Sequence, residues 1–485
     1  MSRPSLVVHG HFYQPPRVDP FSGAMPADPT AAPARDWNAR ISAECYQPNA
    51  VAGNYGAMSW DLGPTLASWL EDGDPAAYGG FARGDAGVNG MAQPFHHAIM
   101  PLAAAHDRRT EIRWGLRDFE LRFGRRPTGM WLPETAVDLA TLRMLADEGI
   151  DHTILAPWQV DSHDVDTRRP VRVPLGDGRE MLAVLYDGLL SAAVSFEPSS
   201  TVDADAFLRD RLVPRFRQAD EEHDRHGSAG LGPLVVIATD GELYGHHQPH
   251  REQFLSRLVG LTAPDDLPYD RPSLAAALAA LDRSLLPVVP LHEATSWSCH
   301  HGVTRWSGDC DCVDNGQWKE PLRSALERLA GGIDALTDDI ARSVAGAPDV
   351  WAARDAWVDV AIGRETAAAF TARHGGDDRL APLMEAQRWR LAMFASCGWF
   401  WEDPTRPETA GSLRAAARAA RLIDGLAGSD LEGRLIADLA LIPEHDGLDG
   451  VAVFRKALAA VGVDASGPAG IGPGNPSARG LRATG

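Results

Sequence analysis

The clearest hydrophobic signal in the chain is a run of five apolar residues at 234–238, which ends abruptly in polar residues. A short, continuous and largely β-branched run is typical of a strand buried on both faces of a parallel sheet. It leads into a polar turn that holds two carboxylates and two histidines: Asp240, Glu242, His246 and His247. In a β/α barrel this end of a strand lies at the catalytic face, because the loops after the strands surround one shared site. The alternative is a solvated turn, since Asp-Gly is common turn chemistry.

Two earlier apolar runs are also followed directly by polar residues. Residues 6–8 lead into His9 and His11, whose two-residue spacing places both imidazoles on one side of a strand. The short run at 128–132 leads through a proline to Glu134, so a further carboxylate follows an apolar segment. The sequence therefore places candidate chemistry at the ends of three separate runs.

Strand-like and helical segments alternate over the first two thirds of the chain. Four stretches show helical spacing: 107–122, 137–148, 204–223 and 253–261. Two further apolar runs, at 152–157 and 286–291, predict strands, and the stretch 171–187 predicts a hairpin inserted after the first of them. This alternation favours a parallel barrel or a doubly wound sheet.

The pattern changes at residue 315. Beyond it, six stretches rich in Ala, Leu, Arg and Glu show helical spacing without strands: 320–344, 350–373, 381–400, 411–426, 431–441 and 451–460. Runs of helices without strands indicate a separate helical domain. We therefore predict three parts: a catalytic β/α domain at 1–314, an α-helical domain at 315–464 and a disordered, Gly- and Pro-rich tail at 465–485.

Composition agrees with a globular protein of two or three domains, because the 485 residues are 44% hydrophobic and 23% charged. A formal net charge of −20 argues against nucleic acid as a partner. No stretch approaches the ~18–20 apolar residues that cross a bilayer, and the amino terminus lacks a secretory signal, so we expect a cytoplasmic protein without a membrane partner. Five cysteines, an odd number, fit a reducing compartment. The oligomeric state is left open.

Three ordered motifs carry a resemblance to a known family. They are His9-x-His11 with Gln14-Pro15, Trp131-Leu-Pro-Glu134, and the stretch from Asp240 through Glu242 to His246-His247. With them the chain resembles glycoside hydrolase family 57, the retaining α-glucan-active enzymes, in its subgroup with an extended C-terminal helical region. The resemblance extends to Cys397-Gly-Trp399-Phe400 and covers nearly the whole chain except the tail. It implies an incomplete (β/α)7 TIM-like barrel followed by an α-helical bundle.

The resemblance also implies a reaction on α-glucans or maltooligosaccharides, of the α-amylase, 4-α-glucanotransferase or branching type. Glu134 corresponds to the nucleophile and Asp240 to the acid/base. Retention needs two carboxyl groups ~5–5.5 Å apart, and the acid needs a raised pKa. The mechanism requires no metal and no cofactor. We expect substrate contacts from nine residues: His9, His11, Gln14, Trp131, Glu242, His246, His247, Trp306 and Trp399.

One position departs from the family pattern. The family commonly carries a glutamate shortly after Gly-Asn-aromatic, and Gly56 stands there, after Gly53-Asn54-Tyr55. The polar contact of that loop, and with it the subsite preference, is therefore open. The aromatic and polar residues of this loop fit either a sugar-facing loop or a packed irregular segment.

Two alternative functions remain on the sequence alone. A metal-dependent deacetylase or mannosidase could use His9, His11, Asp240 and His246 as ligands. That function would not explain the motif around Glu134. A glucan-binding protein without activity could keep the same fold, because fold and motif do not guarantee turnover.

Two further clusters carry open interpretations. Cys299, Cys310 and Cys312 with adjacent histidines have the residue types of a zinc site, although Cys-x-Cys is not the usual zinc spacing. Trp399, Phe400 and Trp401 cannot all face one helix interior, because neighbours are about 100° apart. We expect at least one of these aromatic side chains to project from the helical domain and complete the active site, with a packed interface as the alternative.

Overall fold

The computed structural model describes residues 3–162, 165–216, 232–262, 267–343 and 349–464. Two predicted segments, the end of the helix at 204–223 and the tail at 465–485, therefore lie partly or wholly outside the described residues. The chain divides into two compact units. The first contains the chain up to Gln14, Asp28–Pro94 and Phe119–Ser298, and the second contains Pro15–Ala27, Phe95–Asp118 and the chain from Cys299 onward. The second unit thus begins before the boundary predicted at residue 314 and takes in two earlier segments.

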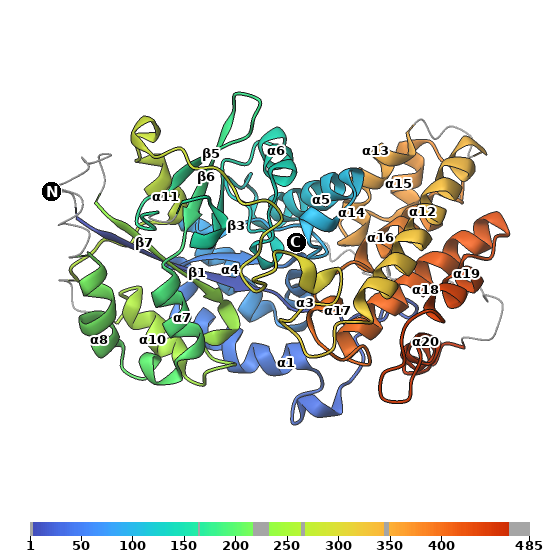
Figure 1. The fold of residues 1–485 in the computed structure, drawn as a ribbon, viewed down its shortest axis with the longest axis horizontal. Helices are drawn as coiled ribbons and strands as arrows, with labels where there is room; N and C mark the ends of the chain where they lie inside the picture. Colours follow the sequence, from blue (N-terminus) through green and yellow to red (C-terminus); the bar gives the residue numbers. More distant parts are fainter. Residues whose placement is uncertain (1–2, 163–164, 217–231, 263–266, 344–348, 465–485) are drawn as a thin grey trace, which may run out of the picture. The chain divides into compact units, whose positions relative to one another are not determined.

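The strands of the first unit form two sheets (Figure 1). The first sheet is entirely parallel and has the order β3-β2-β1-β7, with β1 Ser5–Phe12, β2 Ser59–Leu62, β3 Gly90–Met91 and β7 Leu234–Asp240. The second has the order β4-β6-β5, with β4 His152–Leu155, β5 Val171–Pro174 and β6 Glu180–Leu185. The predicted α/β class is confirmed.

Strand β1 is buried along its whole length, and its two faces contact different cores. Leu6, Val8 and Phe12 belong to one cluster of buried hydrophobic residues, while Val7 belongs to the other. His9 and His11 continue the face of Val7, because side chains alternate along a strand. The second cluster also contains Trp131, which places this tryptophan on the histidine-bearing face.

The helices of the first unit surround these sheets. Nine of the described helices lie wholly in this unit: α1 Trp37–Ile41, α2 Gln47–Ala52, α3 Pro64–Gly73, α4 Pro75–Gly84, α6 Leu139–Asp147, α7 Gly188–Phe196, α8 Ala204–Phe207, α10 Arg251–Leu258 and α11 Leu274–Ala279. Several begin at an aspartate whose side chain accepts a hydrogen bond from the first helical turn, as Asp138 does from the Thr141 backbone N–H. The predicted helices at 137–148 and 253–261 correspond to α6 and α10.

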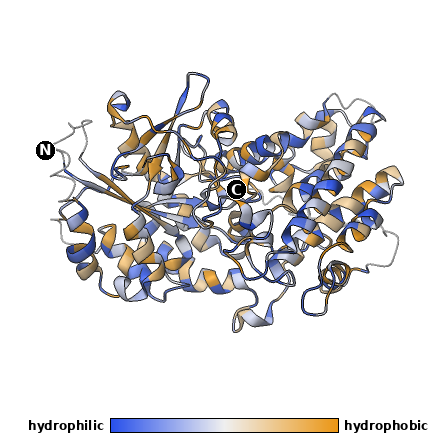
Figure 2. Cartoon of the chain, in the orientation of Figure 1, coloured by the Kyte–Doolittle hydropathy of each residue, from blue (hydrophilic) through white to orange (hydrophobic). Residues whose placement is uncertain are grey.

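The described part of the second unit is helical. Helix α5 (Ala105–Phe123) begins in it, and nine further helices follow: α12 Lys319–Ser343, α13 Val350–Ala356, α14 Val358–Ala361, α15 Ala367–His374, α16 Leu380–Ala392, α17 Cys397–Phe400, α18 Pro407–Ala427, α19 Leu431–Leu439 and α20 Gly450–Ala459. Hydrophilic and hydrophobic residues alternate along these helices, as expected for helices with one packed face (Figure 2). No helix of the described chain is long and apolar enough to cross a membrane.

Two predicted elements differ from the structure. No strand forms at 286–291, where only single bridges join Val288 and Leu291 to other segments. Pro287 and Pro290 lack the N–H that a strand interior donates, which explains the interruption. The hairpin predicted at 171–187 does form as β5 and β6, but it is not an insertion, because β6 pairs in parallel with β4.

A buried ion network holds the second unit together. The Asp107 carboxylate accepts hydrogen bonds from Arg354 Nη1 (2.9 Å) and Arg390 Nη1 (2.6 Å). Arg390 also donates to Asp334 Oδ2 at 2.6 Å, and both arginines are 2% exposed. Because Asp107 precedes residue 314 in the chain and pairs with α13 and α16, its segment belongs to the helical unit.

We predict that Asp107→Ala destabilises the protein strongly, because it leaves two buried guanidinium groups without their shared carboxylate. The free energy of unfolding should fall by about 3–5 kcal/mol in denaturant titrations. Asp339→Ala is the matched control, since Asp339 pairs with Arg342 at the surface of the same unit. It should unfold close to the wild-type midpoint. Equal effects of the two substitutions would show that the network contributes no more than a surface pair.

Candidate active site

The parallel register brings three titratable side chains side by side. His11 on β1 pairs with Asp61 on β2 and with Asp240 on β7. Partners at one register position of a parallel sheet point to the same face. The carboxyl end of the sheet therefore carries a row of two carboxylates with an imidazole between them.

Asp61 holds both histidines of β1. Its carboxylate is fully buried, with Oδ1 3.0 Å from His9 Nε2 and Oδ2 2.8 Å from His11 Nδ1. Burial lowers the pKa of His9, so this imidazole is neutral. Burial also opposes protonation of His11, but the charge and hydrogen bond of Asp61, together with the charges of Asp240 and Glu242, raise its pKa to about 9. His11 is therefore an imidazolium at neutral pH.

Trp131 covers the two histidines. Its indole is fully buried and stacks on His9 (ring centroids 5.0 Å apart) and on His11 (5.1 Å). Trp297 meets the Trp131 ring edge-on at 5.1 Å. The aromatic layer fixes the rings of both imidazoles, and it shows that Trp131 is packed against site residues.

Glu134 is held in an unusual backbone conformation. It has φ 57° and ψ 22°, and Thr135 after it also has a positive φ of 48°. Two consecutive non-glycine residues in the left-handed region cost energy and are found where the surrounding structure fixes them, often at functional sites. Here the Glu134 carboxylate Oε2 accepts hydrogen bonds from Trp297 Nε1 (3.0 Å) and Ser298 Oγ (2.7 Å). The carboxylate thus has a fixed orientation.

Asp240 has the raised pKa expected of an acid. Its side chain reaches solvent, yet protein atoms crowd the carboxyl group, and this loss of solvation is the main reason that its pKa rises to about 6. The positive charge of His11 lowers the pKa, while the negative charges of Glu134 and Asp61 raise it. The electrostatic effect of Glu134 on Asp240 indicates that the two predicted catalytic carboxylates lie near one another.

Glu242 is a second acid with a raised pKa. Burial raises the pKa to about 7, the hydrogen bond from Tyr46 lowers it, and the charge of Asp240 raises it. Tyr46 Oη donates to Glu242 Oε1 at 2.6 Å, and Gln14 Nε2 donates to the same oxygen at 3.4 Å. Glu242 is 4% exposed and held by protein donors, so it is less accessible than Asp240.

Gly241 between these two acids is required by packing. A Cβ atom at this position would come within 2.3 Å of the Phe12 ring. Phe12 ends β1, so only glycine allows the chain after β7 to pass this close to its neighbour. The Asp-Gly-Glu turn is therefore a packed strand end and not a solvated loop.

The remaining predicted contacts of the third motif lie in the same turn. His246 Nδ1 is 2.5 Å from Glu44 Oε2, and its ring meets Trp37 edge-on at 6.1 Å. His247 is exposed, with its ring centroid 4.9 Å from that of His246. His246 thus has a protein partner, whereas the exposed side chain of His247 is available to a ligand.

Trp306 and Trp399 belong to the second unit. The Trp306 ring is fully buried and lies 6.3 Å from Phe400. Trp399 is 1% exposed and stacks on Trp318, with centroids 6.3 Å apart. Of the three consecutive aromatics, Trp401 is the exposed one, at 39%. The burial of Trp306 and Trp399 favours packing inside the second unit over the predicted contact with a sugar.

The loop with Gly56 is a packed segment. Asn54 is fully buried and donates to Asn49 Oδ1 (2.7 Å), and Tyr55 stacks on Phe81 at 3.7 Å. Gly56 ends the 3-10 turn Asn54–Gly56. These contacts favour the packed alternative over a sugar-facing loop.

Four residues that contact the site were not among the predicted site residues: Asp61, Tyr46, Trp297 and Ser298. Asp61 lies within the short strand β2, next to Trp60, and carries no motif of its own. Tyr46 reaches Glu242 across 196 positions, and Ser298 reaches Glu134 across 164. The sequence indicates only that a buried carboxylate needs hydrogen-bond donors. It does not indicate which positions supply them.

The structure does not support the set of metal ligands that the metal-dependent alternative requires. His9 and His11 contact Asp61, and His246 contacts Glu44. Among the residues that the structure describes, the group able to hold a metal ion is formed by Cys299, His301, Cys310 and Cys312, all in the second unit. His9, His11, Asp240 and His246 do not form such a group.

An enzyme that cleaves or transfers glycosidic bonds with retention requires two neighbouring carboxyl groups, one of them with a raised pKa. Comparison with known proteins agrees. Residues 87–262, which include Glu134 and Asp240, match the family described as glycosyl hydrolase family 57. This match confirms the resemblance to glycoside hydrolase family 57 that the motifs predicted. Residues 315–466 match a domain of unknown function, DUF3536.

Solved structures share the fold at low sequence identity. An exo-type maltose-forming amylase from Pyrococcus sp. ST04 matches with a TM-score of 0.73 and 15% identity, over 94% of this chain and 88% of that one. A branching enzyme from Pyrococcus horikoshii matches with a TM-score of 0.64 and 15% identity, over 92% and 99%. An α-amylase from Thermotoga maritima gives 0.59 and 13%, over 94% and 99%. No curated protein sequence is similar enough to count as a match.

We predict that kcat/KM falls as the pH rises through about 6, because Asp240 must be protonated to act as an acid and its pKa is about 6. His11→Gln removes the positive charge that lowers this pKa. The alkaline limb of the pH profile should therefore move to higher pH, even if the rate falls. His246→Gln is the control, since His246 pairs with Glu44, and its limb should not move. An unchanged limb in His11→Gln would contradict the assignment.

Proposed function

We propose that the protein cleaves α-glucosidic bonds of α-glucans with retention and passes the glycosyl unit to water or to a second sugar. The observation that carries the proposal is the interaction of two carboxylates on one strand-end face: the charge of Glu134 helps to raise the pKa of Asp240 to about 6. The family match and the shared fold with amylases and a branching enzyme support α-glucan as the substrate class.

The first half-reaction assigns one role to each carboxylate. Glu134 attacks the anomeric carbon, and its fixed orientation on Trp297 and Ser298 serves this attack. Asp240 gives its proton to the leaving glycosidic oxygen, so the bond breaks as the ester to Glu134 forms. In the second half-reaction Asp240 takes a proton from water or a sugar hydroxyl, which displaces Glu134.

Two side chains near Asp240 support this proton transfer. His11 is positively charged beside Asp240 and stabilises the carboxylate that Asp240 becomes after it has given up its proton. Glu242, with a pKa of about 7, is partly protonated near neutrality, and its protonated form can donate to a sugar hydroxyl. Together with the exposed His247, these side chains form the proposed subsite for the reacting ring.

We also propose the incomplete seven-member barrel for the first unit. Single parallel bridges, Ala92 to Met130 and Gly129 to His152, continue the pairing from β3 through this segment to β4. On the other side, the Asp187 backbone N–H, just after β6, donates to Val236 O of β7 at 2.7 Å. Six strands and the segment around Met130 thus follow one another in parallel, which supports the barrel that the family resemblance implies.

We predict that Glu134→Gln and Asp240→Asn each lower kcat by several orders of magnitude on maltooligosaccharides, with thermal unfolding near that of the wild type. Azide should partly restore a Glu134→Ala variant, because a small anion can replace the missing nucleophile. Glu242→Gln is the matched control and should keep substantially more activity than Asp240→Asn. The opposite order would assign the acid to Glu242.

Product analysis separates the possible activities. Maltooligosaccharides and amylose are incubated with the wild type, and the products are sized and tested for α-1,6 linkages. Short products indicate hydrolysis, longer chains indicate transfer, and new α-1,6 bonds indicate branching. Glucan binding without any product after long incubation would favour the non-catalytic alternative.

We further predict that Trp399→Ala acts through stability. Trp399 is packed on Trp318, and Arg323 lies over its ring at 5.6 Å, so the truncation removes contacts inside the second unit. The melting temperature should fall, while KM for maltooligosaccharides per folded molecule stays near the wild type. Trp401→Ala, at the exposed aromatic, is the comparison variant. A raised KM at normal stability in Trp399→Ala would instead make this residue a sugar platform.

A further inference from the structure

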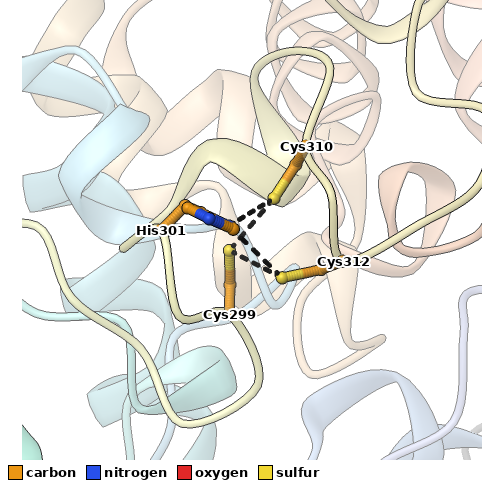
Figure 3. A group of neighbouring side chains, drawn as sticks. All are labelled: Cys299, His301, Cys310 and Cys312. Atoms are coloured by element: carbon orange, nitrogen blue, oxygen red, sulfur yellow. Dashed lines mark hydrogen bonds between the residues drawn. The ribbon is translucent and has the colours of Figure 1, made fainter.

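Four side chains of the second unit converge in one short, irregular stretch of chain (Figure 3). Cys299, His301, Cys310 and Cys312 each direct one possible ligand atom into the same space, and these four atoms lie within 4.8 Å of one another. The only helical turn between the first and the last of them is Thr304–Trp306. Local secondary structure therefore does not hold this segment in shape.

Four of the six distances between these atoms are close to the edges of a metal-centred tetrahedron. Zn–S bonds of ~2.3 Å and Zn–N bonds of ~2.0–2.1 Å place two sulfurs about 3.8 Å apart and a sulfur and a nitrogen about 3.6 Å apart. Cys299 Sγ lies 3.6 Å from Cys310 Sγ and 3.8 Å from Cys312 Sγ. His301 Nδ1 lies 3.2 Å from Cys310 Sγ and 3.6 Å from Cys312 Sγ.

The same distances argue against disulfide chemistry. A disulfide holds its sulfurs at ~2.05 Å, far closer than any of these contacts, and all five cysteines of the chain are free. Three thiols around one imidazole also leave an odd thiol in any pairing. A Cys3His set of this shape is a known composition of structural zinc sites.

The surroundings can balance the charge of such a site. Three thiolates, a neutral imidazole and Zn²⁺ carry a net charge of −1. Lys319 is buried, and its ammonium interacts electrostatically with Cys299 and Cys310. Its Nζ also donates to the Arg305 carbonyl oxygen at 2.9 Å, which ties this cation to the turn between the ligands.

We propose that Cys299, His301, Cys310 and Cys312 bind one Zn²⁺ ion as a structural site. Each cysteine releases its thiol proton to solvent as its sulfur binds, and His301 binds through neutral Nδ1. Four protein ligands leave no open position for substrate or water, so the ion stabilises the segment and takes no part in the chemistry of Glu134 and Asp240. The proposal does not depend on the proposed glycosidase function.

The test measures the metal content of the full-length protein, purified without a histidine tag from zinc-supplemented medium. We expect about one zinc per chain. His301→Ala and Cys310→Ser should lose most of it after dialysis, whereas two control variants should keep it: His300→Ala, next to a ligand, and Cys397→Ser, at a cysteine outside the cluster. His301 is exposed, so its substitution leaves the fold able to form.

Two further measurements keep the test independent of activity and of folding failure. Removal of zinc with a strong chelator should lower the melting temperature by roughly 5 °C, and added Zn²⁺ should restore it. Co²⁺ added to the zinc-free protein should give the visible bands of a tetrahedral thiolate complex, and these bands should be absent in His301→Ala. Zinc-free protein with no bands on Co²⁺ addition, or zinc retained equally by His301→Ala and His300→Ala, would overturn the proposal.

Discussion

The buried carboxylate of Asp61 is the constraint on which the geometry of the site depends. A carboxylate removed from water must be paired or hydrogen-bonded, and Asp61 satisfies this need with the imidazoles of His9 and His11. The pairing fixes the orientation of both rings, and Trp131 covers them from the side. Because β1 runs between β2 and β7, the same contact places a charged His11 beside Asp240.

The charge balance of the site follows from this arrangement. Burial is the main reason that Asp240 and Glu242 ionise less readily than isolated carboxyl groups, while the positive charge of His11 lowers the pKa of both. The pKa of Asp240 rises to about 6 and that of Glu242 to about 7. The Glu134 carboxylate accepts hydrogen bonds from an indole N–H and a hydroxyl, which fix its orientation. A carboxylate with a fixed orientation and an acid with a raised pKa are what a retaining glycosidase needs.

The second unit is held together by other means. Its core includes a buried network of Asp107, Asp334, Arg354 and Arg390, and its irregular segment contains the four converging ligand atoms. Buried ion pairs give little net stability but are costly to break, so they specify one arrangement of helices. The network also explains why a segment at 95–118 belongs to the helical unit.

The sequence by itself determined the local features of this protein. Periodicity identified β1, β7 and most helices, and the three motifs identified the family with Glu134 and Asp240. Only the tertiary structure decided which residues surround them, because Asp61, Tyr46, Trp297 and Ser298 reach the site from positions 50 to 196 residues away in the chain. It also decided that prolines interrupt the run at 286–291 and that β6 joins β4. Such pairings depend on register and packing between distant segments, and a periodic pattern along one segment carries no information about either.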